Sequence, residues 1–412
     1  MLGTGYSRRP WQCRNAPDFI EELSMGAQQL FSELFREAVY SKTAMRVRMV
    51  AQDEIDSAAV SRWRDLAKRS CHHNPFLLPE FVVPAWKYLT PEREQVLVIV
   101  ESTHDGRWLA AGGFTLAQVT TSLPVPHAVA STSDYTFRTG LLLDADHASK
   151  ALDLLLSQLT SGGWLYQGIE FPGLRYDSIL ARELTASVRR LGYSWRTLGQ
   201  RMVPALFPEI VSDEYLTAHW SASRRKTFRR SRNKLEAVGP VELRLHQSPD
   251  AVAVALENFL RLEAASWKGD EGTACLSNRR DELFIREVVE GLAPHGNVLI
   301  SELTAGDRVA AAALNFTAGT GLFAFKIGWD NEFAHTSPGV LHEVELLHAS
   351  QNRLREFTLF DSCATESSYI APIWPERIPV VTGLVCSSYL ARLSRRLLDA
   401  GSNTKRLVAS WW

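Results

Sequence analysis

The sequence lacks the features that mark several protein classes. Its 412 residues include only five cysteines, no two of them in C-x-x-C spacing, which argues against a disulfide framework or a cysteine zinc site. No apolar run approaches the roughly 18 residues that a membrane-spanning helix needs. No apolar segment follows the arginines near the N-terminus, so we expect no secretory signal and a cytoplasmic protein with reduced thiols.

An excess of one charge is also missing, since 45 basic and 46 acidic residues leave a formal net charge of -1. The chain as a whole therefore gives no reason to expect nucleic acid or an anionic membrane as a partner. No G-x-S-x-G, P-loop or H-E-x-x-H motif is present, and the histidines lack metal-ligand spacing, so we expect no bound metal. Apolar residues make up 45% of the chain, enough for a sizeable core.

The order of predicted elements divides the chain into four parts. Residues 1–44 form an N-terminal extension with apolar residues at roughly helical spacing, and 205–240 form a linker with a strongly basic helix. Residues 45–204 and 241–412 each contain a β-hairpin, a further strand, a helix and another strand. This repeated order predicts an α/β fold of two similar domains.

The most informative segment is 321–362, where an apolar strand, 321–329, leads through a loop into a helix. Ser337 is a favoured N-cap and Pro338 a favoured first residue, so the helix start is well marked. A helix N-terminus offers free amides and a partial positive charge, and Gly339, followed by Val340, allows close backbone approach. This start could therefore hold a pyrophosphate, or it could be an ordinary capped helix after a strand.

Lys326 interrupts the apolar strand and needs a physical explanation. A buried lysine is costly without a partner. Strand alternation places it on the same face as Leu322 and Ala324. It either lines a cleft, paired with an anionic ligand or with Asp330, or lies on a solvated sheet face.

Three carboxylates are candidates for the general base. Asp330 and Asp361 lie at or near the C-terminal ends of two predicted strands, where open α/β sheets bind ligands. Glu302, within another predicted strand, is the third. Any of them could accept a proton from an attacking amine, and the sequence does not rank them.

The segment Ser266-Trp267-Lys268-Gly269 ends a helix in which Glu263 lies near one face together with apolar residues. Trp267 could form the wall of a substrate site, with Lys268 contacting a phosphate or carboxylate. Alternatively, the lysine complements the helix dipole and the glycine terminates the helix.

These segments together resemble a known family. The run Phe325-Lys326-Ile327-Gly328-Trp329-Asp330, the Ser-Pro-Gly-Val-Leu-His that follows it, Ser266 to Gly269, Phe360 to Cys363 and Trp374-Pro375-Glu376-Arg377 resemble the CelD-like acetyltransferase family of the GNAT superfamily. The resemblance covers about residues 46–385. That family is similar in fold to the Fem aminoacyl-transferases, which carry two GNAT domains in one chain. The usual GNAT signature Q/R-x-x-G-x-G/A is absent from both halves.

The resemblance implies tandem GNAT-like domains, each a mixed sheet flanked by helices. It implies acyl transfer from acyl-CoA, with no permanently bound cofactor, to an amine or hydroxyl of a small-molecule or saccharide acceptor. Ser337, Gly339 and Val340 would then hold the donor. Trp267, Lys268, Trp329 and Trp374 would bind the acceptor beside Lys326, Asp330, Asp361 and Glu302.

Two other functions fit the sequence. A Fem-like ligase would use aminoacyl-tRNA and contact RNA through the basic helix 224–234. A degenerate GNAT fold could also act as a non-catalytic binding protein.

Overall fold

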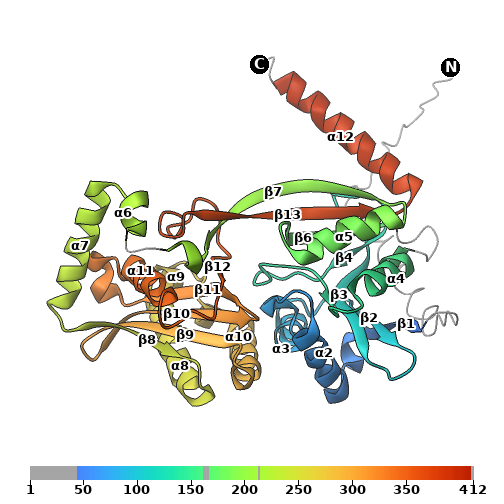
Figure 1. Cartoon of the computed structure of the whole chain (residues 1–412). Helices are drawn as coiled ribbons and strands as arrows, with labels where there is room; N and C mark the ends of the chain where they lie inside the picture. The colour runs from blue at the N-terminus through green and yellow to red at the C-terminus, as the bar shows by residue number, and fades with distance from the viewer. Residues whose placement is uncertain (1–43, 161–166, 212–213, 410–412) are drawn as a thin grey trace, which may run out of the picture.

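The computed structural model describes residues 44–160, 167–211 and 214–409. The predicted N-terminal extension lies outside these residues, except for residue 44. Within them, thirteen strands form one continuous sheet, in the order β1-β2-β3-β4-β6-β13-β7-β12-β11-β10-β9-β8, with β5 paired to β3 (Figure 1). The strands are β1 Met45–Ala51, β2 Gln95–Ser102, β3 Trp108–Gln118, β4 His127–Ala130, β5 Leu142–Leu143, β6 Gly168–Arg175, β7 Ser194–Leu206, β8 Val241–His246, β9 Val298–Ala305, β10 Arg308–Ala318, β11 Gly321–Trp329, β12 Leu359–Asp361 and β13 Glu376–Cys386.

Helices cover both faces of this sheet. They are α2 Ser57–Arg69, α3 Pro79–Pro84, α4 Ala148–Thr160, α5 Ile179–Arg190, α6 Tyr215–His219, α7 Ala222–Glu236, α8 Pro249–Ala265, α9 Trp267–Asp270, α10 Arg279–Leu292, α11 Pro338–Ser350 and α12 Tyr389–Ala409. Their ends follow local sequence signals. In α10, for example, the Asn278 side chain accepts from the Arg280 amide, and Asp281 and Glu282 complement the dipole of the first turn. No helix among the described residues is long and apolar enough to cross a membrane.

The two halves repeat one topology. In the first half, β1 to β4 form an antiparallel meander, and β6 returns parallel to β4 after α4. In the second half, β8 to β11 form the same meander, and β12 returns parallel to β11 after α11. The repeated order expected from the sequence is therefore present.

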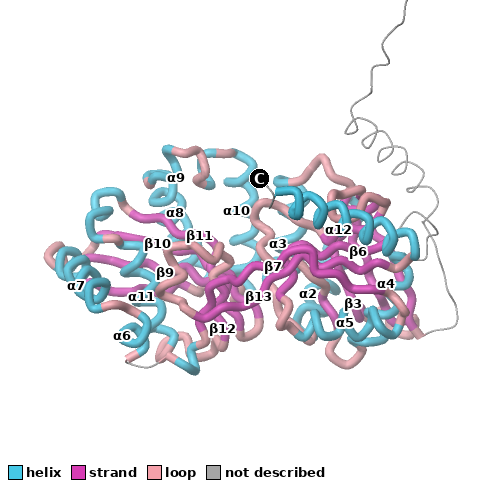
Figure 2. The backbone as a smooth tube through the Cα atoms, turned by 90° about the horizontal axis from the view of Figure 1, so that it is seen from above, coloured by secondary structure: helices cyan, strands magenta, loops and turns pink. Residues whose placement is uncertain are grey.

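Two long strands join the halves. β13, near the C-terminus, lies between β6 and β7 in the sheet of the first half, and β7 also pairs with β12 of the second half. Figure 2 shows β7 and β13 bridging the two groups of strands. The sheet is thus continuous, and the division at residues 205–240 remains a prediction about domains.

The halves also share a core. Phe81 of α3 packs edge-to-face on Phe284 of α10, with ring centroids 5.3 Å apart, and Phe76 packs in the same way on Phe323 of β11. One buried cluster contains all four rings together with Trp63 and Trp86. Aromatic pairs of this kind add to the free energy gained by burying apolar area, so this packing fixes the halves against one another.

Candidate active site

A buried carboxylate organises the candidate site. Glu263 lies one turn before the end of α8, on the face that buries Phe259 and Leu260. The Lys326 Nζ atom lies 2.9 Å from its Oε1, and the Lys268 Nζ atom lies 3.7 Å from the same oxygen. The Cys275 amide donates to its Oε2 at 2.9 Å. Because a buried charge needs a partner, Glu263 accounts for the lysine inside an apolar strand.

A β-bulge decides which way Lys326 faces. β11 pairs with β10 at Ala324 and again at Lys326, but Phe325 between them has no partner. Such an extra residue reverses the alternation of side chains beyond it. Leu322 and Ala324 pack against the α11 side of the sheet, whereas Lys326 contacts Glu263 of α8. The prediction that Lys326 shares a face with Leu322 and Ala324 is therefore wrong, and so is its suggested pairing with Asp330.

Gly328 allows α8 to approach the strand. A Cβ atom at this position would lie 2.5 Å from the Glu263 backbone nitrogen, closer than side chains tolerate. The absence of a side chain thus lets the end of α8 reach β11. Lys268, just beyond that end, then donates from Nζ to the Ile327 carbonyl at 2.7 Å. The family-like segments 266–269 and 325–329 meet at this point.

The first half contributes Tyr135 to the same cluster. Its hydroxyl lies 3.5 Å from the Lys326 Nζ atom and donates to Asp281 Oδ2 at 2.7 Å. Its ring stacks on Phe284, and the ammonium of Lys326 lies 5.0 Å from the ring centroid. Burial raises the pKa of Tyr135 well above its usual range, so the phenol is neutral at pH 7. The site is therefore built from both halves.

The charged groups of the cluster are Lys268, Lys326, Glu263 and, through the Tyr135 hydroxyl, Asp281. Burial lowers the pKa of Lys268, although Glu263 opposes that shift. For Lys326 burial acts in the same direction, but Cys275 and Glu263 outweigh it and its pKa is raised. Burial also raises the pKa of the Cys275 thiol to about 12, so this thiol is neutral at pH 7.

An open strand edge lies beside this cluster. β11 and β12 pair only from Gly321 with Leu359 to Phe323 with Asp361, while β11 continues for six more residues to Trp329. The backbone groups of residues 324–329 on that edge are therefore not bonded to β12. The Ile327 carbonyl accepts from Lys268, and the other backbone groups at this parting of two strands can bind an extended ligand in the manner of an added strand.

The start of α11 lies on the other face of the same strand. The Cβ position of Gly339 would be 3.6 Å from Trp329 and 3.8 Å from Ile327, so both side chains border the helix start. Ser337 is exposed and has left-handed backbone geometry, with φ 54°, and its side chain makes no capping bond. The prediction of a serine side-chain cap is wrong, because this backbone turns the residue away from the N-cap conformation.

The helix start offers fewer donors than expected. Pro338 has no N–H, and the amides of Val340 and Leu341 both donate to the Ser337 carbonyl. Among the described residues, the Gly339 amide is the donor of this turn without a backbone acceptor. An anion held here would rely on that amide and on the helix dipole.

Asp361 and Arg138 form a buried ion pair between the halves. Arg138 Nε lies 2.8 Å from Asp361 Oδ2, and its Nη2 lies 2.5 Å from Oδ1. The Cys363 amide also donates to Oδ1. Neither side chain is appreciably exposed, so Asp361 has a structural partner for each oxygen.

Glu302, Asp330 and Trp374 have partners other than the two lysines. Glu302 accepts from His246 and from Asn258, each at 2.9 Å. Asp330 caps the turn after β11 and pairs with Arg308 at 3.0 Å. Trp374 is fully buried against Phe360. Trp267 opens α9, and its side chain lies outside the described part of the structure.

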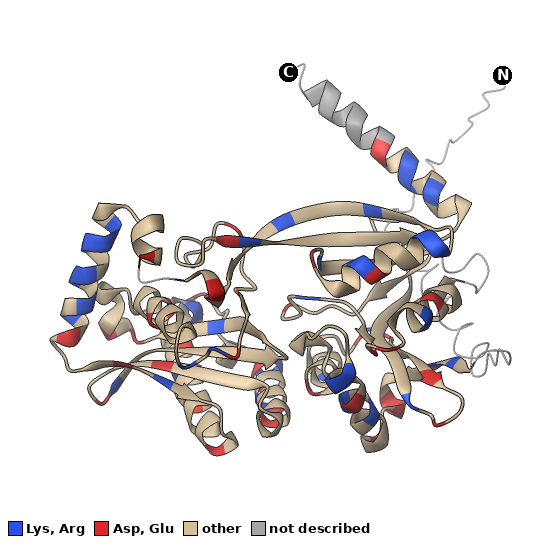
Figure 3. Cartoon of the chain, in the orientation of Figure 1, with Lys and Arg blue, Asp and Glu red and all other residues tan. Residues whose placement is uncertain are grey.

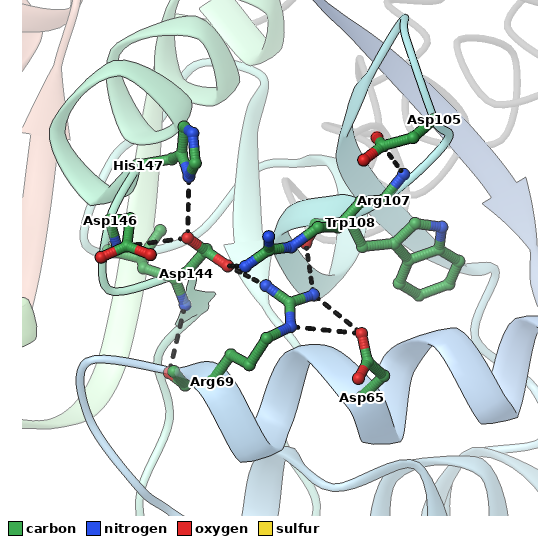
Figure 4. Close-up of polar contacts among 10 residues, drawn as sticks. Asp65, Arg69, Asp105, Arg107, Trp108, Asp144, Asp146 and His147 are labelled. Atoms are coloured by element: carbon green, nitrogen blue, oxygen red, sulfur yellow. Dashed lines mark hydrogen bonds and ion pairs between the residues drawn. The ribbon is translucent and has the colours of Figure 1, made fainter.

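The corresponding place in the first half is filled by its own side chains. Asp144 lies just before α4 and accepts from Arg69, from Arg107 at 2.9 Å and from His147 at 2.8 Å (Figure 4). Asp144 is buried, and its carboxylate already occupies the approach to this helix start. Arg69 and Arg107 neutralise this carboxylate, so the polar side chains at this place in the first half satisfy one another.

Sequence reasoning missed three residues of this region. The sequence places Glu263 on a helix face with apolar residues, and an acidic residue among buried positions indicates a buried cationic partner. Tyr135 and Arg138 lie in an irregular segment, and no periodic signal marks them. Their partners are 146 and 223 residues away, respectively, so local spacing could not reveal them.

Comparison with known proteins agrees with this geometry. A model of the acetyltransferase (GNAT) domain family matches residues 222–369. The fold is GNAT-like. The crystal structure of FemX superposes with a TM-score of 0.50 at 10% identity, covering 82% of this chain and 98% of FemX. No curated protein matches the chain in sequence.

Two further solved structures share less of the geometry. L-PGS from Bacillus licheniformis gives a TM-score of 0.45 at 12% identity, over 85% of this chain and 96% of that one. A tandem GNAT protein from the clavulanic acid biosynthesis pathway gives 0.38 at 13% identity, over 83% of this chain and 98% of that one.

Proposed function

We propose that this protein transfers an acyl group from acyl-CoA to an amine or hydroxyl of a small-molecule or saccharide acceptor. The observation that carries the proposal is the parting of β11 from β12 inside the segment that matches the GNAT domain. The donor's acyl arm would lie along the free edge of residues 324–329. Its pyrophosphate would face the start of α11, near Ser337, Gly339 and Val340.

The lysine cluster supplies the chemistry in this proposal. Attack on a thioester places negative charge on the carbonyl oxygen, and a fixed cation or backbone N–H stabilises it. Lys326, held charged by Glu263, would stabilise this oxyanion. Lys268 would be a second cation beside the reacting groups, and the proton lost by the attacking amine would pass to the leaving CoA thiolate. Trp329 and Trp267 would border the acceptor.

Ser337 allows a direct test of the donor site. Asp and Asn both tolerate left-handed backbone, and they are nearly identical in shape. We expect Ser337→Asp to weaken acyl-CoA binding about tenfold, because its carboxylate would repel the phosphates, and Ser337→Asn to leave binding near the wild-type value. Calorimetric titration measures acyl-CoA binding, and the release of free CoA in the presence of candidate amines measures acyl transfer. Equal affinity of the two variants for acyl-CoA would show that the donor's phosphates do not bind at this helix start.

A second candidate function rests on α7. Lys226, Arg229, Arg230 and Lys234 are exposed on this helix, and none of them has an ion-pair partner among the described contacts. Figure 3 shows the basic residues repeated along α7. Such a surface suits an RNA backbone, as a ligase using aminoacyl-tRNA would require.

Salt dependence separates the two functions. If aminoacyl-tRNA is the donor, tRNA affinity falls steeply with salt concentration. The double substitution Arg229→Glu with Arg230→Glu then reduces the slope of log affinity against log salt by about two. If acyl-CoA is the donor, tRNA binding is weak and these substitutions leave acyl transfer unchanged.

A further inference from the structure

α12 exposes an apolar face to solvent within the described part of the structure. Tyr389, Leu390, Leu393 and Leu397 are 69%, 49%, 39% and 65% exposed, which concentrates four large apolar side chains within nine residues. At 100° per residue they occupy an arc of about 100° on one side of the helix. Isolated exposed apolar residues need no explanation, but a continuous stripe marks an interaction surface.

The opposite side of the helix docks on the body. Ala391 is buried beside Leu123 and Leu384, and Arg395 donates to the Ser122 carbonyl at 3.0 Å. Figure 1 shows α12 extending beyond the end of β13, away from the sheet. The apolar stripe therefore faces outward on a helix that projects from the molecule.

Positive charge flanks this stripe. Arg392 and Arg396 lie next to it, and neither has an acidic partner among the described contacts, whereas Arg395 pairs with Asp399. The sequence of residues 389–409 contains five basic residues and one acidic residue, a formal net charge of +4. The net charge of the whole chain, -1, gives no sign of this local excess of positive charge.

We propose that α12 binds the surface of a bilayer that contains anionic lipids. A helix with an apolar stripe, a basic polar side and little overall hydrophobicity lies in the interface plane, with its stripe at the boundary of headgroups and acyl chains. Arg392 and Arg396 would then contact anionic headgroups. A second copy docking through the same stripe is disfavoured, because it would bring like charges together.

The test uses the full chain and sedimentation with vesicles of phosphatidylcholine, alone or with about one quarter phosphatidylglycerol. We expect binding to the anionic vesicles that weakens with salt, and much weaker binding to the neutral ones. Leu393→Glu with Leu397→Glu should weaken binding at least tenfold, and Arg392→Glu with Arg396→Glu about tenfold on anionic vesicles only. These exposed positions are not part of the folded core, and circular dichroism verifies that each variant is folded.

Two matched controls accompany these variants. Val254→Glu changes an isolated apolar residue on α8 that is 68% exposed, and Lys226→Glu with Arg230→Glu reverses charge on α7. Neither control should alter vesicle binding.

Four results would overturn the proposal. They are no binding to anionic vesicles, binding unaffected by the α12 variants, binding abolished by the α7 variant, and binding only after residues 1–43 are removed. The last result would mean that the chain's own N-terminal segment covers the stripe.

Discussion

Replacing Arg138 by methionine is expected to lower the free energy of unfolding by about 4 kcal/mol, because it leaves Asp361 buried without its cation. The pair joins a loop of the first half to the end of β12 in the second half. Urea unfolding measures the loss. Replacing both partners, as Arg138→Met with Asp361→Leu, should recover much of it, since two apolar side chains leave no unpaired charge.

An exposed pair of the same chemistry serves as the control. Arg190 and Asp153 form two bonds of 2.8 Å, but solvent screens them. We expect Arg190→Met to cost less than about 1 kcal/mol. If Arg138→Met unfolds at the wild-type urea concentration, the Arg138–Asp361 pair does not hold the halves together, and Asp361 becomes a candidate base again.

Replacing Lys326 by methionine is expected to reduce kcat/KM at least 100-fold, mainly through kcat. The variant lacks the cation that would stabilise the oxyanion, a loss of about 3 kcal/mol in transition-state stabilisation. It also leaves Glu263 with only the more distant Lys268, so a lower stability accompanies the loss. Steady-state kinetics with the acyl donor and an accepted amine measure the effect.

A double variant separates the two consequences. Lys326→Met with Glu263→Gln removes this ion pair as a whole and leaves Lys268 with its bond to the Ile327 carbonyl, so part of the lost stability should return. Its activity should remain low, because the cation is still absent. A double variant with near wild-type turnover would assign Lys326 a purely structural role.

The sequence predicted much of the local structure of this fold. The bounds expected for β11, residues 321–329, agree with the structure, because apolar residues and flanking turn residues mark this strand. Lys268 and Lys326 were singled out separately, and the structure places both beside Glu263. These expectations rest on patterns within about twenty residues.

Long-range and irregular features could not be predicted from local sequence patterns. The place of β13 between β6 and β7 depends on pairing across the whole chain, which strand periodicity does not encode. The bulge at Phe325 has no sequence mark among apolar neighbours, and it reversed the predicted face of Lys326. The Arg138–Asp361 contact likewise needed the folded structure, because neither residue has a local partner that suggests it.

The most direct test of the donor site is amide hydrogen exchange with and without a non-hydrolysable acyl-CoA analogue. The account predicts slower exchange in residues 324–329, at the free edge of β11, and in residues 337–341, at the start of α11. Protection limited to the corresponding region of the first half, near β4 and α4, or no protection at saturating ligand, would contradict acyl transfer in the second half.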